Sequence, residues 1–274
     1  MIDRELIKRA IAEDLAGGVD VTSTSTIAAD ATCTADFVAR KDGVLAGVEM
    51  AKAVLEEVGL KDITVLKNDG DSVSIGDAII TVSGNTRAIL LAERTALNFL
   101  GHLSGIATLA SRWVSAVSGT QCLVRDTRKT TPGYRELEKF AVRMGGGTNH
   151  RMSLSDAALI KDNHIAAAGG ARQAFSAVRS AYPKAPIEIE VDTLDQLREI
   201  LPLNPDLVLL DNMSPEQCAE AVAIVKGATK LEASGGISIE NARAYADSGV
   251  DYIAIGALTH SAQVLDIGLD MRAE

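Results

Sequence analysis

The segment of residues 187–236 decides the fold, because one pattern occurs in it three times: IEIE at 187–190, LVLLD at 207–211 and LEASGG at 231–236. Each copy is a short apolar run that ends at a polar residue, and a stretch with helical spacing separates each copy from the next. This alternation predicts parallel strands that are joined by crossover helices.

The same pattern continues on both sides of this segment. Further apolar runs lie at 122–124, 157–160 and 252–255. In a parallel α/β barrel the carboxyl ends of all strands share one face, so the residues that end the runs should converge there. These residues, spaced by 21 to 29 positions, are Lys161, Glu190, Asp211, Ser234 and Gly256. The sequence therefore predicts a polar site at that face.

The first third of the chain has a different pattern. Residues 2–15 carry apolar side chains near helical spacing and end at a Gly-Gly pair, which predicts an amphipathic helix. Asp-Gly and Asn-Asp-Gly turns then separate short β-type runs, and a helix is predicted near 50–58. The β-type runs lie at 35–39, 63–66 and 78–82. Residues 88–117 predict helices, so a small α+β domain precedes the α/β domain.

The composition restricts the class of protein. A hydrophobic content of 47% and a charged content of 23% favour a large packed core. Charges within the first ten residues do not fit a secretory signal, and no apolar run approaches the ~18 residues that cross a bilayer. The three cysteines, Cys33, Cys122 and Cys218, lack the spacing of a disulfide framework or a zinc site. We expect a cytoplasmic protein with reduced thiols and no membrane partner.

The charge is distributed unevenly. The net charge of -10 disfavours nucleic acid and anionic membranes as partners. Residues 94–161, however, contain ten Lys or Arg and four Asp or Glu, a local +6 that leaves -16 elsewhere. A basic centre in an acidic protein favours a site for a small polyanion, although chance clustering would give the same count. We assign Arg135 and Lys139, which alternate with acidic residues on a predicted helix, to a solvated face.

A glycine loop after one strand is suited to phosphate. Ser234-Gly235-Gly236 leads into a predicted helix that Ser238 could cap and that runs to about Ser248. Backbone N–H groups and the positive end of a helix dipole would both face an anion there. Barrels usually bind phosphate after the penultimate strands, and Gly256-Ala257 supplies the neighbouring loop. An ordinary glycine turn is the alternative.

Basic residues gather on two further loops and at one strand end. They are Arg128 and Lys129 in DTRKTTPG, His150 and Arg151 in GGGTNHR, and Lys161. Arginine can hold a carboxylate by two parallel hydrogen bonds, whereas lysine acts as a compact charge. This set is typical of a site for a dicarboxylate or a pyrophosphate. Lys161 could instead form a Schiff base, but its charged neighbours favour an anion-binding ammonium.

The two strand-end carboxylates allow three interpretations. Glu190 and Asp211 could form a glycosidase-like acid and base pair. They could also hold Mg²⁺ with the hydroxyl and phosphate oxygens of a ligand, since that ion prefers hard oxygen ligands. Finally, they could cap strand ends or pair with nearby lysines.

Taken in order, these motifs resemble the quinolinate phosphoribosyltransferase family, the decarboxylating enzymes of NAD synthesis. The matches cover nearly the whole chain and include Glu93-Arg94-Thr95, Leu159-Ile160-Lys161-Asp162-Asn163-His164, Glu188-Ile189-Glu190-Val191, Leu210-Asp211-Asn212 and Glu232-Ala233-Ser234-Gly235-Gly236-Ile237. The resemblance implies an α/β protein with an N-terminal α/β sandwich domain at 1–103, completed by 262–274. An incomplete, open TIM-like α/β barrel would occupy 104–261. The implied reaction converts quinolinate and phosphoribosyl pyrophosphate to nicotinate mononucleotide, pyrophosphate and CO₂.

The resemblance also implies residue roles. Lys129, Glu190 and Asp211 would be catalytic, with Glu190 and Asp211 associated with Mg²⁺. Quinolinate would contact Arg128, His150, Arg151 and Lys161, and the 5-phosphate of the second substrate would contact Ser234, Gly235, Gly236, Ile255, Gly256 and Ala257. The chain would form a homodimer in which Arg94 reaches the partner's site, and assembly of dimers into hexamers stays open.

Three other functions compete with this interpretation. One is a relative of the same fold associated with molybdenum transport, whose matching motif lacks a lysine such as Lys161. Another is a nicotinate phosphoribosyltransferase that releases no CO₂, but the cations Arg94, Arg128, Arg151 and Lys161 suit a second carboxylate. The third is a non-catalytic nucleotide sensor, against which Glu190 and Asp211 count.

Overall fold

A computed structural model of the chain describes residues 2–272, which fall into two compact units. The first unit contains the residues up to Ser111, residues 136–146 and the residues from Ser261 onward, and the second contains residues 112–135 and 147–260. We predicted boundaries at 103/104 and 261/262. The observed division falls later, within helix α4 (Thr86–Ala116), and it groups helix α5 (Arg135–Met144) with the first unit.

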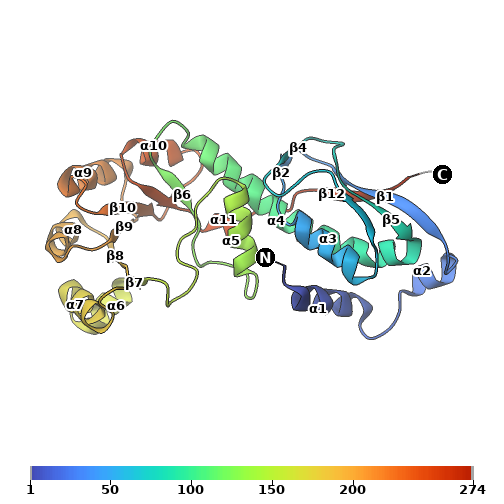
Figure 1. The fold of residues 1–274 in the computed structure, drawn as a ribbon. Helices are drawn as coiled ribbons and strands as arrows, with labels where there is room; N and C mark the ends of the chain where they lie inside the picture. The colour runs from blue at the N-terminus through green and yellow to red at the C-terminus, as the bar shows by residue number, and fades with distance from the viewer. Residues whose placement is uncertain (1, 273–274) are drawn as a thin grey trace. The chain divides into compact units, whose positions relative to one another are not determined.

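The first unit is built on a four-stranded antiparallel sheet with the order β12-β1-β5-β3 (Figure 1). Its strands are β1 (Thr32–Ala39), β3 (Asp62–Val65), β5 (Ala78–Asn85) and β12 (Ile267–Met271), and a separate ribbon pairs β2 (Gly43–Val44) with β4 (Ser72–Val73). Strand β12 comes from the end of the chain and pairs with β1, with Leu269 opposite Phe37. A strand from the C-terminal part of the chain therefore forms one edge of this sheet.

Helices cover this sheet. Helix α3 (Val48–Glu57) packs on β3 and β5, and α1 (Arg4–Leu15) packs on α3. Asp3 caps α1 by accepting a hydrogen bond from the N–H of Leu6, and Asp20 caps α2 (Val21–Thr26) in the same way. Alternate residues of β1, including Phe37, are fully buried, as the half-buried strand pattern predicts.

Helix α5 joins the first unit because it packs on α4. The Nε2 atom of His102 on α4 lies 3.0 Å from Oε1 of Glu138 on α5. Just after α5, a Cβ at Gly145 would stand 2.2 Å from the carbonyl oxygen of Ala107, so the close approach of the two segments requires glycine there. Leu137, Ala141 and Val142 of α5 are buried.

Neither Arg135 nor Lys139 on α5 lies on a solvated face, so our prediction for these two residues is wrong. Lys139 is completely buried. Arg135 is half-buried and donates hydrogen bonds to the hydroxyl of Thr130 and to the carbonyl of Met152. The alternation of charges along the helix predicted a solvent-exposed face, but packing of the helix on other elements determines which of its side chains are buried.

The second unit contains six parallel strands in the order β6-β11-β10-β9-β8-β7. They are β6 (Leu123–Arg125), β7 (Ala158–Ile160), β8 (Ile187–Val191), β9 (Leu207–Asp211), β10 (Lys230–Ser234) and β11 (Tyr252–Ala254). All six predicted runs are strands, with ends shifted by at most two residues. Within residues 2–272 no hydrogen-bonded ladder joins β6 to β7, so the predicted open barrel is confirmed.

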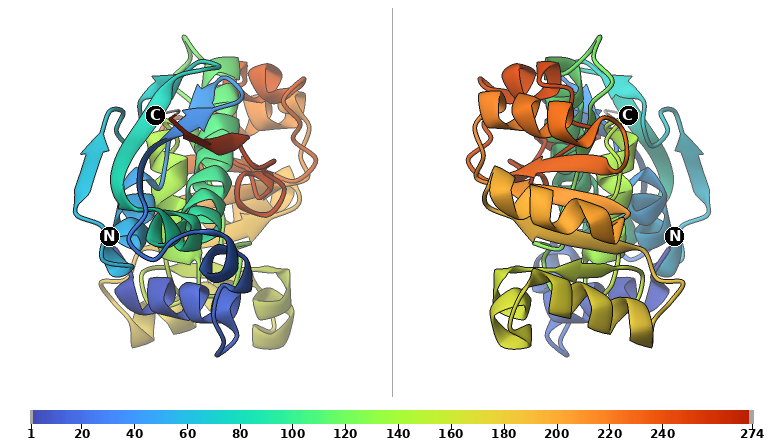
Figure 2. Two further views of the ribbon diagram at one scale, coloured as in Figure 1. Left: turned by 90° about the vertical axis from the view of Figure 1, so that its right-hand side faces the viewer. Right: turned by 90° about the vertical axis from the view of Figure 1, so that its left-hand side faces the viewer.

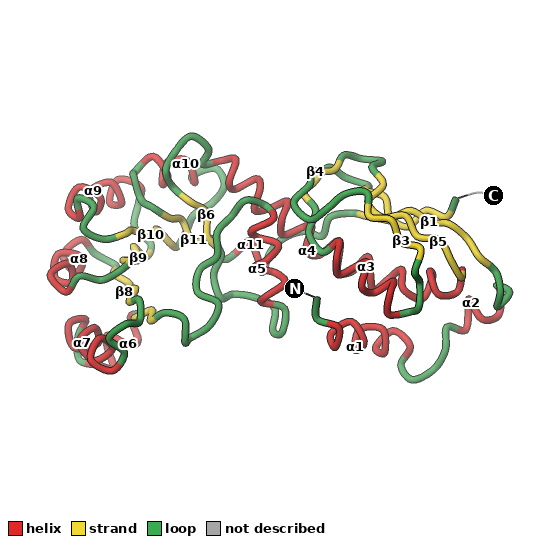
Figure 3. The backbone as a smooth tube through the Cα atoms, in the orientation of Figure 1, coloured by secondary structure: helices red, strands yellow, loops and turns green. Residues whose placement is uncertain are grey.

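Crossover helices follow the strands and cover the outer side of this sheet (Figures 2 and 3). They are α6 (Asp162–Ala168), α7 (Ala171–Ala181), α8 (Leu194–Ile200) with the 3₁₀ turn Leu201–Leu203, α9 (Pro215–Val225) and α10 (Ala242–Asp247). The short helix α11 (Ala257–His260) follows the last strand of this sheet and joins no two of its strands. Capping boxes begin α8 at Thr193 and α9 at Ser214, because each hydroxyl accepts the N–H three residues later. In the described part of the chain, no helix combines the length and apolar character that a membrane span needs.

The strands of the second unit place acidic residues inside the barrel. All five residues of β8 are buried, and Ile187, Ile189 and Val191 alternate with Glu188 and Glu190. Successive side chains of a strand point to opposite faces, so the three apolar residues share the face toward the helices and both glutamates share the inner face. The site grows from this inner face.

Candidate active site

A cavity of about 740 Å³ opens at the carboxyl ends of the strands of the second unit. Its walls include every site residue that we predicted in this unit: Arg128, Lys129, His150, Arg151, Lys161, Glu190, Asp211, Ser234, Gly235, Gly236, Ile255, Gly256 and Ala257. The predicted convergence of the strand ends is confirmed. Arg94 belongs to the first unit, where it is exposed on α4, and does not line this cavity.

An ion pair joins two strand ends at the rim, the name we give to the part of the cavity wall that carries Arg128, Lys161, Glu190, Asp211 and Ser234. The Nζ atom of Lys161 lies 2.6 Å from Oε2 of Glu190; the lysine side chain is 47% exposed, whereas that of Glu190 is 8% exposed. An ammonium that is paired with a carboxylate is a poor nucleophile, so this contact disfavours a Schiff base at Lys161. Because the lysine is exposed, it can reach an incoming anion, but the buried Glu190 carboxylate then needs another cation in its place.

A second carboxylate faces the same rim. Burial and the neighbouring Glu190 carboxylate raise the pKa of Asp211. One oxygen of Asp211 accepts a hydrogen bond of 2.6 Å from the amide of Asn212. The two carboxylates form a set of hard oxygen ligands, and a divalent cation would relieve the repulsion that helps to raise the pKa of Asp211.

Two arginines form the basic side of the cavity. Burial and the adjacent Arg128 guanidinium lower the pKa of Arg151. Arg151 donates a hydrogen bond of 2.7 Å to the carbonyl of Ala157, which orients its guanidinium. The Nε of Arg128 is buried and has no hydrogen-bond partner within residues 2–272. Neighbouring guanidinium groups with an unused donor form a site that an anion would complete.

The remaining basic residue, Lys129, is placed by its backbone. Its N–H donates to the hydroxyl of Thr127, and its carbonyl accepts a hydrogen bond of 2.8 Å from the hydroxyl of Thr259. The alkyl chain of Lys129 runs beside Gly256, where an added Cβ would stand 3.0 Å from the lysine Cδ. Lys129 therefore lies between Arg128 on its own loop and the predicted phosphate loop at 255–257.

Both glycines of the loop after β10 adopt the left-handed backbone conformation, but the helix behind the loop is shorter than predicted. Gly235 and Gly236 have φ angles of 86° and 62°, and a Cβ at Gly235 would stand 2.1 Å from Oδ1 of Asn212. Helix α10 begins at Ala242 and has six residues. Our prediction of a helix capped by Ser238 is wrong, because the Asn241 side chain accepts the N–H of Ser238 and closes a turn before the helix starts.

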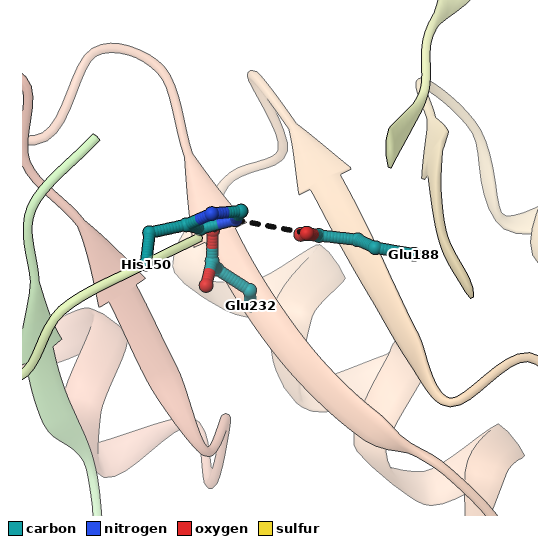
Figure 4. Close-up of side chains that lie close together, drawn as sticks. All are labelled: His150, Glu188 and Glu232. Atoms are coloured by element: carbon teal, nitrogen blue, oxygen red, sulfur yellow. Dashed lines mark ion pairs between the residues drawn. The ribbon is translucent and has the colours of Figure 1, made fainter. Parts of the chain in front are cut away.

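A largely buried group of side chains, which we call the floor, lies beneath the rim and consists of Arg125, His150, Glu188 and Glu232. Figure 4 shows His150 between the two glutamates. Nε2 of His150 lies 2.8 Å from Oε2 of Glu188 and 3.5 Å from Oε1 of Glu232. Nη1 of Arg125 lies 2.8 Å from Oε2 of Glu232. Burial and the Glu188 carboxylate raise the pKa of Glu232 to about 7.

Sequence reasoning assigned no role to three members of the floor. Arg125, Glu188 and Glu232 lie in or next to apolar runs, where they were counted as parts of strands. A usable signal did exist, because Glu188 is two residues from Glu190 and so shares its face of β8. Charged residues at inward positions of a buried strand are unusual enough to indicate a site.

Comparisons with known proteins agree with this architecture. The family model described as the N-terminal domain of quinolinate phosphoribosyl transferase matches residues 20–104, and the model of the C-terminal domain matches residues 106–270. Over 98% of its length the chain is 50% identical to nicotinate-nucleotide pyrophosphorylase [carboxylating] of Mycobacterium leprae, of which it covers 96%. It is 40% identical to a probable enzyme of the same name from Bacillus subtilis, covering 98% of this chain and 93% of that protein.

Solved structures give the same result. The nicotinate-nucleotide pyrophosphorylase of Ehrlichia chaffeensis superposes with a TM-score of 0.95 at 38% identity, covering 99% of both chains. Human nicotinic acid phosphoribosyltransferase, at 15% identity and a TM-score of 0.65 over all of this chain and 74% of that one, shares the fold alone. On the domain matches and the near full-length identities, this chain belongs to the quinolinate phosphoribosyltransferase family.

Proposed function

We propose that the cavity of the second unit carries out the reaction of this family. Quinolinate and phosphoribosyl pyrophosphate would give nicotinate mononucleotide, pyrophosphate and CO₂, a step of de novo NAD biosynthesis. The observation that carries the proposal is the meeting of Arg128, Arg151 and Lys161 with Glu190 and Asp211 around one cavity. Cations on one side suit two polyanionic substrates, and carboxylates on the other suit a cation or a developing positive charge.

The cations divide into two groups. Arg128, Arg151 and Lys161 hold the two carboxylates of quinolinate, the arginines by paired hydrogen bonds and the lysine after it leaves Glu190. The backbone N–H groups of 234–236 and 255–257 hold the terminal phosphate of the second substrate. Lys129 lies between the two loops and is placed to contact both substrates.

The carboxylates Glu190 and Asp211 fit Mg²⁺, because they are hard oxygen donors whose mutual repulsion a cation would relieve. When bound, the ion would neutralise charge on the departing pyrophosphate. The same two carboxylates face the ribose carbon as it gains positive character and stabilise it electrostatically. The arginines meanwhile keep the quinolinate nitrogen directed at that carbon.

Decarboxylation follows from the charge of the ring. Once the ring nitrogen is bonded to ribose it is positive, so the ring can hold the electrons that CO₂ leaves behind. Cations around the departing carboxylate must orient it without stabilising it more than the transition state, since only differential stabilisation accelerates the step. A lysine such as Lys161, which is exposed and carries a compact charge, suits that requirement better than the double hydrogen bond of an arginine.

The chain would act as a homodimer in the cytoplasm. Arg94 is exposed on α4, outside the cavity of its own chain, and we propose that it enters the site of the partner subunit. Burial raises the pKa of the Cys122 thiol to about 12 and that of Cys218 to about 11, which suits the inert thiols of a reducing compartment.

Complementation tests the shared site. Arg94→Ala and Lys161→Ala should each be inactive as homodimers. If Arg94 acts in the partner's site, a dimer that contains one subunit of each variant has one site with both cations intact, so mixing and reassociation should restore up to about half of the activity per hybrid dimer. A mixture that stays inactive although hybrids form would refute a shared site.

A direct assay tests the reaction. Purified protein is mixed with quinolinate, phosphoribosyl pyrophosphate and Mg²⁺, and both CO₂ and nicotinate mononucleotide are followed. We expect equal amounts of the two products, no product without Mg²⁺, and no turnover when nicotinate replaces quinolinate. Efficient use of nicotinate would instead favour a non-decarboxylating enzyme.

A further inference from the structure

The imidazole of His150 uses both ring nitrogens inside the protein. Nδ1 accepts a hydrogen bond of 2.8 Å from the backbone N–H of Arg151. Because an N–H group donates to it, Nδ1 carries no proton, and the neutral ring must carry its proton on Nε2. That nitrogen faces Glu188 at 2.8 Å. We assign the Nε2–H tautomer from these two contacts.

This tautomer argues against a metal ion at the floor. His150, Glu188 and Glu232 could each offer one ligand atom, and these atoms lie within 4.8 Å of one another. A histidine that binds a metal through Nε2 keeps a proton on Nδ1 and donates it to a neighbouring acceptor. Here the neighbour of Nδ1 is itself a donor. The three side chains therefore share protons instead of a cation.

The histidine links the buried acids to the substrate cavity. Oδ1 of Asp126 accepts the N–H of His150 at 2.8 Å, and the ring of His150 accepts the next N–H along the chain, that of Arg151. The guanidinium of Arg151 is held in turn by the carbonyl of Ala157. Two consecutive backbone groups and one side chain are thus fixed, which places Arg151 before any ligand arrives.

A second cavity supports the role of His150 in holding Arg151 in place. A space of about 210 Å³ at the amino ends of the strands includes Glu188 in its wall, and the residues that it shares with the large cavity are His150 and Arg151. These two residues therefore form the partition between the cavities. Turning the imidazole would break the partition and release the backbone of Arg151.

We propose that Glu188 is a positioning residue that fixes His150 as the Nε2–H tautomer. In this tautomer, Nδ1 of His150 anchors the backbone of Arg151, whose guanidinium binds the substrate anion. His150 itself donates no hydrogen bond to that substrate. This rests on the proposed function of Arg151 in binding quinolinate. It differs from the role that family resemblance gives His150, a direct contact to quinolinate.

Nitrogen-15 NMR of labelled histidine tests the tautomer without any substrate. The chain has four histidines, and His150→Asn identifies the signals of residue 150. We expect an unprotonated Nδ1 and a protonated Nε2 in the free protein, and the same pattern after quinolinate is added. A protonated Nδ1 in the free protein, or a change of tautomer on binding, overturns the proposal.

Substitutions at Glu188 test the connection to the substrate. Glu188→Gln keeps an oxygen acceptor for Nε2–H and should retain the tautomer and the KM for quinolinate within about threefold. Glu188→Leu removes the acceptor and should mix the tautomers and raise this KM by roughly tenfold, with a smaller change in kcat. Glu199→Leu, which removes an exposed glutamate on α8, is the control for lost charge and should leave both constants unchanged.

The outcomes separate this proposal from the proposed function. If the wild-type protein does not turn over quinolinate but the NMR pattern is as expected, the proposed function is refuted and the tautomer assignment is supported. If the wild-type protein is active and Glu188→Leu folds with an unchanged KM, the positioning role is wrong. If Glu188→Leu does not fold, the proposal is tested by the NMR of the wild-type protein and of Glu188→Gln, which should both have the Nε2–H tautomer at His150.

Discussion

The rim and the floor of the cavity are built by the same strands and from the same kinds of residue, yet they differ in burial and in partners. Strand β8 supplies Glu190 to the rim and Glu188 to the floor, and β10 supplies Ser234 to the rim and Glu232 to the floor. At the rim Glu190 pairs with an exposed lysine, whereas at the floor Glu188 faces a histidine that is almost fully buried. Glu190 and Glu188 are only two residues apart on β8, yet the partner of Glu190 is exposed and the partner of Glu188 is held in the interior.

The difference has a physical cause. An ion pair near solvent is weak and readily exchanged for a ligand, but a buried charge that loses its partner is strongly destabilising. The rim is therefore suited to binding and release, and the floor to holding the rim in place. Substitutions should separate the two, because rim variants should lose activity while staying folded, whereas floor variants should lose stability first.

The largest expected effect is at the rim. Arg128→Ala and Lys161→Ala should each lower kcat/KM for quinolinate by about a thousandfold or more, because each removes charge-assisted hydrogen bonds to a carboxylate. Circular dichroism and urea unfolding should match the wild-type protein. Arg128→Lys is the control that keeps the charge and loses the paired geometry, and it should recover only part of the activity. Loss of stability in these variants would erase the distinction between rim and floor.

The next effect is at the floor. Arg125→Ala removes the partner of Glu232 and the contact with the Tyr252 ring, 3.9 Å away. It should lower the free energy of unfolding by about 3 kcal/mol, as measured by urea denaturation. Adding Glu232→Gln should recover part of this loss, because the uncompensated carboxylate is then gone. If Arg125→Ala were as stable as the wild-type protein, the floor would not be a fixed element.

The sequence allowed prediction of those parts of the molecule that depend on local pattern. Most strands of the second unit are largely apolar runs between helical stretches, and the rim residues of the strands stand where the runs end. The role of Glu188 depends on His150, which is 38 positions earlier in the chain, and the burial of Lys139 depends on the packing of α5. Neither is contained in a local pattern. The position of Arg94 in a dimer depends on a second chain.

A smaller effect is expected in the glycine loop of the rim. Gly235→Ala places a Cβ where Oδ1 of Asn212 lies and forces alanine into a positive φ, so the KM for phosphoribosyl pyrophosphate should rise by roughly tenfold. Gly236→Ala is the matched control, because its φ is also positive but its Cβ meets no atom within 4 Å. Steady-state kinetics should show the smaller change in Gly236→Ala. Equal effects would mean that backbone strain alone matters.

The smallest effect is a pH dependence from the floor. The pKa of Glu232 is raised to about 7 in the folded protein, above its ordinary value of 4.5. Its contribution to stability is therefore fully present below about pH 4.5 and is lost as the pH rises through 7. Glu232→Gln cannot ionise, so between pH 5 and pH 8 its Tm should fall by a few degrees less than that of the wild-type protein. Parallel Tm curves in differential scanning calorimetry would contradict this ionisation.

Titration calorimetry of quinolinate tests most directly whether cations from separate loops act together at the rim. The wild-type protein should bind quinolinate, and both Arg128→Ala and Lys161→Ala should lose measurable affinity, although the two residues lie on different loops 33 positions apart. Undiminished affinity in both folded variants would show that the cations at the rim do not form the substrate site.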